Sequence, residues 1–261
     1  MRSASWVYFT HRMRSEFRTA LFWLIGFCVY AGLIVAVYPS VEGALNLDAM
    51  PLDLRIAFNF ANFDELSGFL GAELLGVIMP ILLPFFGMIM LTFAIAGAEE
   101  RGRLDLILAN PLPRRAIILA SSATAAIYMF AIAFATGATI VIMARILDIA
   151  IGTRDAFAGT LALWPLACAF GGLAILLSAT VRQRSTALAV CGALVLISYL
   201  ALVIARLADG FSWLRFGSAF YFYGTAITTG FWWGGAAVLM TAAFALVAGA
   251  VVLFNRRDIY A

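Results

Sequence analysis

The chain has 261 residues, of which 64% are hydrophobic and only 12% are charged, and its net charge is +3. Soluble globular domains carry about 25% charged residues, so this composition excludes an ordinary soluble protein and indicates an integral membrane protein. All 17 basic residues are arginine. Because a phosphate-binding P-loop requires lysine, any ATPase that drives this protein must be another chain.

Residues 1–18 mix aromatic side chains such as Trp6 and Phe9 with Arg12 and Arg14, a pattern typical of an amphipathic helix in the membrane interface. The first apolar stretch that follows lacks a small-residue cleavage pattern, so we expect a retained span. Six apolar stretches are long enough to cross a membrane, at 19–38, 71–97, 116–143, 156–179, 186–205 and 230–254. The sequence therefore predicts an all-α integral membrane protein with six transmembrane helices in a single domain, 1–261.

Arginine is unevenly distributed between the two sides of the membrane that these spans define. Twelve arginines fall on the side that holds both termini, and five fall on the other side. By the positive-inside rule, we expect both termini to lie in the cytosol.

The second apolar stretch has about 27 residues and would be near 40 Å long as a helix, whereas the hydrocarbon core is about 30 Å thick. Pro80 and Pro84 lie four residues apart within it, and each removes a backbone hydrogen bond. The sequence predicts a kink there. Two explanations of this kink remain open: a structural bend beside a packed neighbour, and a hinge that lines a substrate path.

Two outer segments are rich in apolar or aromatic residues. Residues 52–63 are short and rather apolar, and we expect them to lie at the membrane surface. Residues 211–223, FSWLRFGSAFYFY, are densely aromatic, which favours the membrane–water boundary. We expect a partly re-entrant or interfacial segment there.

The spans carry no Asp, Glu, Arg or His at mid-depth, which argues against a proton-coupled antiporter, an ion pump or a charged-ring channel. His11 lies in the N-terminal segment, and the three cysteines lie in apolar stretches. No H-E-x-x-H or C-x-x-C motif occurs. The sequence thus predicts no catalytic, cofactor-binding or metal-ligating residue, and the chain is not expected to be an enzyme.

Uncharged polar residues within the spans most often hydrogen-bond between helices. For Thr92, Ser198 and Tyr199 the alternative is that they face a substrate path, and the sequence leaves both readings open. The apolar, uncharged spans favour an amphipathic or lipid-like substrate.

Residues 98–115, AEERGRLDLILANPLPRR, form a charged segment between the second and third stretches and carry 7 of the chain's 31 charged residues. We expect a helix of about ten residues, too short to be stable alone in water, that ends at the following prolines. Charges four residues apart, at Glu99 and Arg103 and at Arg101 and Asp105, would pair along it.

One face of this predicted helix is apolar, because Leu104, Ile107 and Leu108 fall on the same side. We expect this face to dock into a groove of a cytosolic partner. A solvated inner loop is the alternative.

The run EERGRLDLILANPLPR resembles the loop after the second span of type-2 ATP-binding-cassette (ABC) exporter permeases, whose pattern is roughly E-E-[RK]-x-x-G-T-L-x-x-L-L-x-x-P-[LVI]-x-R. The matching residues are Glu99, Glu100, Arg101, Gly102, Leu104, Leu108, Pro111, Leu112 and Arg114. The spacing is shorter than usual because Gly102 directly follows Arg101, and Arg103 stands where threonine is common. A terminal F-x-R-R-D-I motif at 254–259 and the six-span plan extend the resemblance over nearly the whole chain.

The resemblance implies the permease subunit of an ATP-driven exporter of the bacterial or archaeal plasma membrane. Two permease subunits, as a homodimer or a heterodimer, would form the path, and cytosolic ABC ATPase subunits, which bind ATP and Mg, would dock beneath them. Glu99, Glu100, Arg101 and Gly102 would form the junction between the second span and the coupling helix.

In that scheme ATP-driven closure of the ATPases switches the spans between inward-facing and outward-facing states. Membrane lipid is a further expected partner, and nucleic acid is not. A non-transporting membrane scaffold or assembly subunit of a multi-protein complex is the alternative function.

Overall fold

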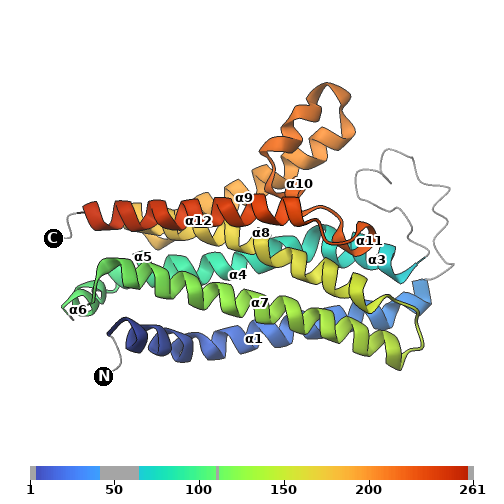
Figure 1. Cartoon of the computed structure of the whole chain (residues 1–261), viewed down its shortest axis with the longest axis horizontal. Helices are drawn as coiled ribbons and strands as arrows, with labels where there is room; N and C mark the ends of the chain where they lie inside the picture. The colour runs from blue at the N-terminus through green and yellow to red at the C-terminus, as the bar shows by residue number, and fades with distance from the viewer. Residues whose placement is uncertain (1–3, 42–64, 110–111, 258–261) are drawn as a thin grey trace.

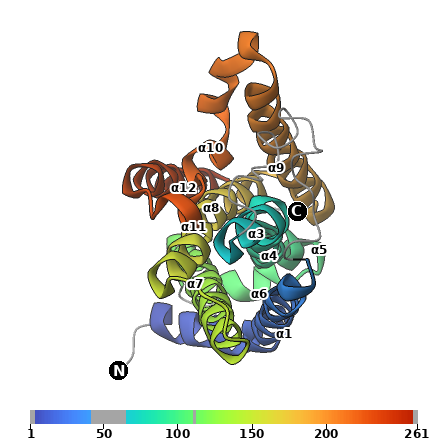
Figure 2. The same ribbon diagram turned by 90° about the vertical axis from the view of Figure 1, so that its right-hand side faces the viewer.

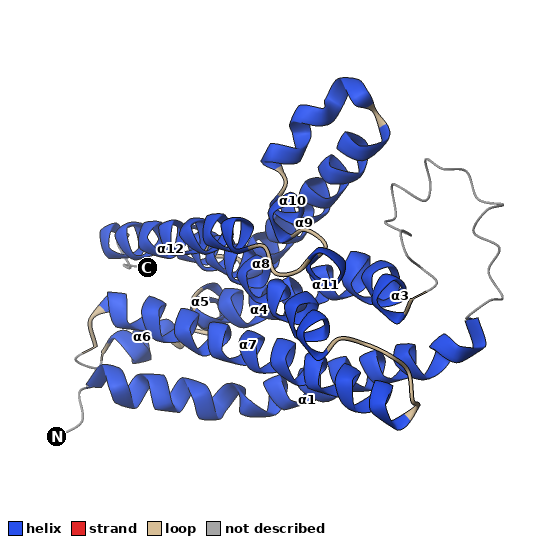
Figure 3. Cartoon of the chain, turned by 45° about the vertical axis from the view of Figure 1, so that its right-hand side comes forward, coloured by secondary structure: helices blue, strands red, loops and turns tan. Residues whose placement is uncertain are grey.

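The computed structural model describes residues 4–41, 65–109 and 112–257. Every regular element in this part of the chain is a helix (Figure 3). Six helices or helix runs are long and apolar enough to cross a membrane, which confirms the predicted all-α architecture with six candidate spans. They are α1 (Ala4–Val41), the run of α3 (Leu66–Glu73), the π-helix η2 (Leu74–Ile78) and α4 (Met79–Ala94), then α7 (Arg114–Ile146), α8 (Thr153–Thr180), α9 (Arg184–Leu207) and α12 (Trp233–Arg256).

Helix α8 forms the centre of the bundle. It packs against α4, α7 and α12, while α1 lies along the outer side of α7 (Figure 2). In its most apolar window 72% of the residues of α8 are buried, whereas the corresponding share is 22% for α1, α9 and α12. The outward faces of these peripheral helices are apolar, as expected for surfaces that face lipid or a second subunit.

The two short helices α5 (Ala96–Glu100) and α6 (Leu104–Leu108) lie at one end of the bundle, together with the start of α1 and the end of α12 (Figure 1). We call this the inner end, since the arginine distribution predicts that it faces the cytosol. Helix α3 lies at the opposite, outer end (Figure 1).

Helix α1 is continuous over 38 residues, so the expected interfacial helix and the first span are parts of one helix, and the division of their roles at residue 18 stays a prediction. A helix of this length is about 57 Å long, nearly twice the thickness of a hydrocarbon core of about 30 Å. Figure 2 shows its first turns crossing the view, while the remainder runs toward the viewer. The hydroxyl of Tyr128 in α7 donates to the backbone carbonyl of Met13 in this first part.

The second span departs from α-helical geometry directly before the first of its two prolines. In η2 the N–H of Met79 donates to the carbonyl of Leu74, five residues back, instead of to that of Leu75. The next residue, Pro80, has no N–H. The carbonyl of Leu75 therefore accepts neither from Met79, as in an α-helix, nor from Pro80, as in a π-helix. Instead, the buried hydroxyl of Tyr223 donates to it at 3.0 Å.

The predicted irregularity of this span thus lies in the π-turn that precedes Pro80. Pro84 lies inside α4, and both prolines are buried. Bulges of this kind are common at functional sites, and a hinge role for Pro80 and Pro84 stays a prediction.

The aromatic outer segment divides into an exposed part and a buried part. The 3-10 helix η3 (Asp209–Gly217) projects from the bundle and exposes Trp213, whereas α10 (Ala219–Tyr223) and α11 (Ala226–Thr229) pack against α8. Figure 1 shows this projection above α10. The prediction for residues 52–63 falls outside the described residues.

Candidate coupling site at the inner end

A hydroxyl group from α8 interrupts the second span near its inner end. The N–H of Ala96 donates to Oγ of Ser178 at 2.9 Å, and this hydroxyl donates to the carbonyl of Thr92 at 3.2 Å. In an uninterrupted helix Ala96 would donate directly to Thr92. Ser178 is therefore inserted into the hydrogen-bond ladder, a recognised cause of helix kinks, and it separates α4 from α5.

Helix α5 ends in a Schellman motif centred on Gly102. This residue has a φ of +62°, its N–H donates to the carbonyl of Glu99, and the N–H of Arg103 donates to the carbonyl of Ala98. Glycine is favoured here because a side chain would strain the left-handed conformation. The predicted ten-residue helix is therefore wrong: the segment is two helices of five residues joined by a sharp turn.

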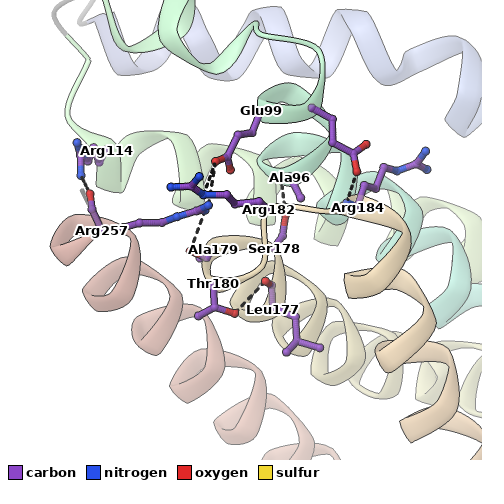
Figure 4. A network of polar contacts seen from close by, with 11 residues as sticks. Ala96, Glu99, Arg114, Leu177, Ser178, Ala179, Thr180, Arg182, Arg184 and Arg257 are labelled. Carbon is purple, nitrogen blue, oxygen red and sulfur yellow. Dashed lines mark hydrogen bonds and ion pairs between the residues drawn. The ribbon is translucent and has the colours of Figure 1, made fainter. Parts of the chain in front are cut away.

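The carboxylate of Glu99 joins the second span to two other inner ends (Figure 4). Its Oε1 lies 2.9 Å from Nη2 of Arg257, which follows α12, and 3.6 Å from Nε of Arg182, in the loop after α8. Arg257 also donates to the carbonyl of Ala179 at 3.4 Å. The side chains of Glu99 and Arg257 are mostly buried, so these charges interact with little screening by water.

Glu100 connects the same segment to the start of α9. Its Oε1 accepts a hydrogen bond at 2.7 Å from the backbone N–H of Arg184 (Figure 4). The guanidinium of Arg184 lies 5.2 Å from the ring centroid of Phe93, and that of Arg101 lies 4.4 Å from the same ring. Both acidic residues of the predicted junction therefore contact partners outside their own segment.

The end of α12 is held by the first residue of α7. Nη1 of Arg114 donates to the carbonyl of Arg257 at 2.7 Å and to that of Phe254 at 3.2 Å. Cations favour the carbonyl end of a helix, where backbone acceptors lack partners. Part of the charged segment and part of the terminal F-x-R-R-D-I motif are thus in contact. Residues 110–111 and 258–259 of these two motifs lie outside the described residues.

The apolar side of α6 faces the protein's own spans. Leu104 is only 1% exposed and belongs to the core, and Ile107 packs against that core, whereas Leu106 is 70% exposed. The prediction that Leu104 belongs to an exposed docking face is therefore corrected, because the spans already cover this side chain. Ile107 is only partly buried, and its docking role stays a prediction. The backbone of Leu108 ends α6, and its side chain lies outside the described part of the structure.

The two predicted ion pairs along one helix are replaced by other contacts. Because the turn at Gly102 separates Glu99 from Arg103 and Arg101 from Asp105, the regular four-residue spacing is lost. Glu99 pairs with arginines from other elements, as described above.

The three residues considered for a substrate path do not lie together. Thr92, fully buried near the inner end, donates to the carbonyl of Met88. Ser198, about 21 Å along α9 from its inner end, accepts from the N–H of Ala219, and the ring of Tyr199 packs edge-on against Phe220. A role of these residues in a path stays a prediction.

Sequence reasoning missed Ser178 and the partners of Glu99. A serine near the end of a span was a weak signal, but its contact with Ala96 joins residues 82 positions apart, which no local pattern reveals. Among the described residues no group of three or more His, Cys, Asp or Glu side chains is placed to hold a metal ion.

The charged segment at the inner end thus contacts the inner ends of three helices, α8, α9 and α12, in addition to the two spans that it connects. The comparison with curated proteins gave no match to this chain. Residues 9–259 match the family model described as ABC-2 family transporter protein, and the chain therefore belongs to this family of membrane transport components.

Proposed function

We propose that the chain is the membrane-spanning permease subunit of an ATP-driven ABC exporter, powered by a separate ATPase chain that docks on the segment 98–115. The observation that carries the proposal is the polar junction at the inner end. Through Glu99, Glu100 and Arg114, this segment contacts the inner ends of α8, α9 and α12. A force applied to α6 would therefore reach several spans at once.

The docking surface is the outward side of α6 together with the charges beside it. Leu106 and Asp105 are exposed, as are Arg101 and Arg103 at the preceding turn. An exposed apolar side chain within a charged rim is the usual composition of an interaction surface. Leu106 thus takes the role that the sequence had suggested for Leu104.

The proposed exporter contains a second permease subunit, either a copy of this chain or a related one, and two ATPase subunits that bind ATP and Mg. ATP-driven closure of the ATPases alternates the spans between inward-facing and outward-facing states. The apolar, uncharged spans favour an amphipathic or lipid-like substrate.

The test is to co-express the chain with a P-loop ATPase encoded beside it and to purify the complex. Leu106→Asp should lower the amount of co-purified ATPase at least about tenfold, because it places a charge at the centre of the docking surface. The matched control is Leu147→Asp, which changes a partly exposed leucine at the outer end of α7.

Unchanged ATPase binding by the Leu106→Asp variant would remove the docking proposal. An ATPase that binds but is stimulated by no amphipathic substrate in reconstituted membranes would favour the scaffold function instead.

A further inference from the structure

A cavity of about 820 Å³ lies between the first part of α1, the inner half of α4 and α6. Its polar wall carries four arginines, from α1, the turn before α6 and the start of α9. They are Arg12, Arg101, Arg103 and Arg184. The same wall holds one carboxylate, that of Glu16, so the formal charge of the lining is +3 with His11 neutral. The coupling mechanism proposed above requires no ligand in this cavity, although Arg101, Arg103 and Leu106 of the proposed docking surface also line it.

Two of these arginines have buried N–H groups that lack an acceptor. Nη1 of Arg12 pairs with Glu16 at 3.0 Å, but its Nε and Nη2 are buried without a hydrogen-bond partner, as is Nε of Arg184. The side chain of Arg12 is only 11% exposed. Buried charged donors without acceptors are costly, and both of these side chains line the same cavity. A ligand there that accepts hydrogen bonds and carries negative charge would lower this cost.

The positions of Arg101 and Arg184 strengthen this reading. Both guanidinium groups lie within 5.2 Å of the centroid of the Phe93 ring, which the cavity also exposes. Two like charges at one ring repel each other, and an anion beside them would relieve that repulsion.

The other wall of the cavity is apolar and extends toward the membrane interior. It includes Ile89, Met90 and Phe93 of α4 and Leu112. From Gly97 to Ile89 the cavity follows the second span over about 12 Å. A free phosphate ion would leave this wall without a partner, whereas a lipid would cover it with its first acyl carbons.

We propose that this cavity binds a phospholipid with an anionic headgroup from the leaflet at the inner end. The headgroup phosphate accepts from Arg12 and Arg184, with Arg101 beside it, and the start of the acyl chains lies along Ile89 and Met90. The bound lipid would contact α1 and α6 together. This proposal concerns the chain alone and does not rest on the proposed ATPase or on transport.

The experiment uses the purified full-length chain in an uncharged detergent, with bound lipids counted by native mass spectrometry. Dihexanoyl phosphatidylglycerol, an anionic lipid probe, should bind saturably with one molecule per chain. The double variant Arg12→Gln/Arg184→Gln should bind it at least about tenfold more weakly. The matched control is Arg14→Gln, which removes the same charge from an exposed position on the same helix.

Three results would overturn the proposal. Equal weakening by Arg14→Gln would show that the attraction is only diffuse charge. Equal affinity for the zwitterionic dihexanoyl phosphatidylcholine would show that the site does not select an anion. Inorganic phosphate that binds as tightly as the lipid would make a free phosphate the ligand.

Circular dichroism and thermal unfolding without lipid check that the variants are folded. If the double variant does not fold, Arg101→Gln replaces it, because this side chain is exposed and its loss leaves the core intact. A weakening of about threefold is then expected, and wild-type affinity in this folded variant would count against the site.

Discussion

Glu99 at the end of the second span and Arg257 just after the sixth lie 2.9 Å apart, although 158 residues separate them in the chain. The pair joins the charged segment to the C-terminal motif, and Arg182 approaches the same carboxylate oxygen. Glu99 and Arg114 of the charged segment thus both contact Arg257 of the C-terminal motif. These motif positions form a junction between spans.

Loss of Arg257 should destabilise the chain. Arg257→Ala leaves a mostly buried carboxylate with a weaker partner, and we expect unfolding in detergent to become easier by about 1–3 kcal/mol. A double-mutant cycle with Glu99→Ala should give a coupling of about 1 kcal/mol. Arg256→Ala is the control, since the neighbouring side chain is exposed. Additive effects of the two substitutions would contradict a direct interaction.

Removal of the Tyr223 hydroxyl should destabilise the π-turn. In Tyr223→Phe the buried carbonyl of Leu75 has no donor, which should cost about 1–3 kcal/mol in the free energy of unfolding. Tyr221→Phe is the matched control, because the ring of Tyr221 packs against Phe222 and Trp232 and remains in place. Equal costs for the two variants would show that the hydroxyl of Tyr223 has no special role.

The same turn predicts a partial rescue by a substitution at Pro80. Pro80→Ala restores a backbone N–H that can donate to the carbonyl of Leu75 or of Gly76. The cost of Tyr223→Phe should therefore fall by about 1 kcal/mol in the Pro80→Ala background. Unfolding measurements on the wild type, the two single variants and the double variant test this prediction. An unchanged cost of Tyr223→Phe would show that the missing N–H of Pro80 is not the reason why Leu75 needs the hydroxyl.

Ser178→Ala should leave two buried backbone groups, the N–H of Ala96 and the carbonyl of Thr92, without their hydrogen-bond partner. We expect the free energy of unfolding to fall by about 1–3 kcal/mol. Ser185→Ala, at an exposed serine, should change stability by less than about 0.5 kcal/mol. Hydrogen exchange at Ala96 provides the second measurement: its amide should exchange faster in Ser178→Ala than in the wild type. Unchanged exchange would mean that another acceptor takes over.

The orientation of α6 predicts opposite roles for two neighbouring leucines. Leu104→Ala creates a cavity in the core and should cost about 2–5 kcal/mol, whereas Leu106→Ala should change stability by less than about 0.5 kcal/mol. Thermal unfolding of the two variants measures the difference. A larger loss of stability for Leu106→Ala than for Leu104→Ala would contradict this orientation, because it would show that the face with Leu106 is the buried one.

The sequence was sufficient to predict the elements that composition and length determine. Six apolar stretches and the charged segment 98–115 follow from the cost of placing charge in hydrocarbon, and that cost acts on each residue locally. The sequence could not predict which way the apolar side of α6 faces. An apolar stripe that includes Leu104 can pack equally well against a partner or against the chain's own spans. The insertions of Ser178 and Tyr223 depend on residues 82 and 148 positions away.

The burial of Leu104 has a consequence for the order in which a complex would assemble. Because Leu104 is already covered by the spans, α6 presents Leu106 and the charged residues beside it on its outward side. The burial of Leu104 therefore needs no soluble protein. A cytosolic partner would meet a helix whose main apolar contact is already made within the membrane subunit.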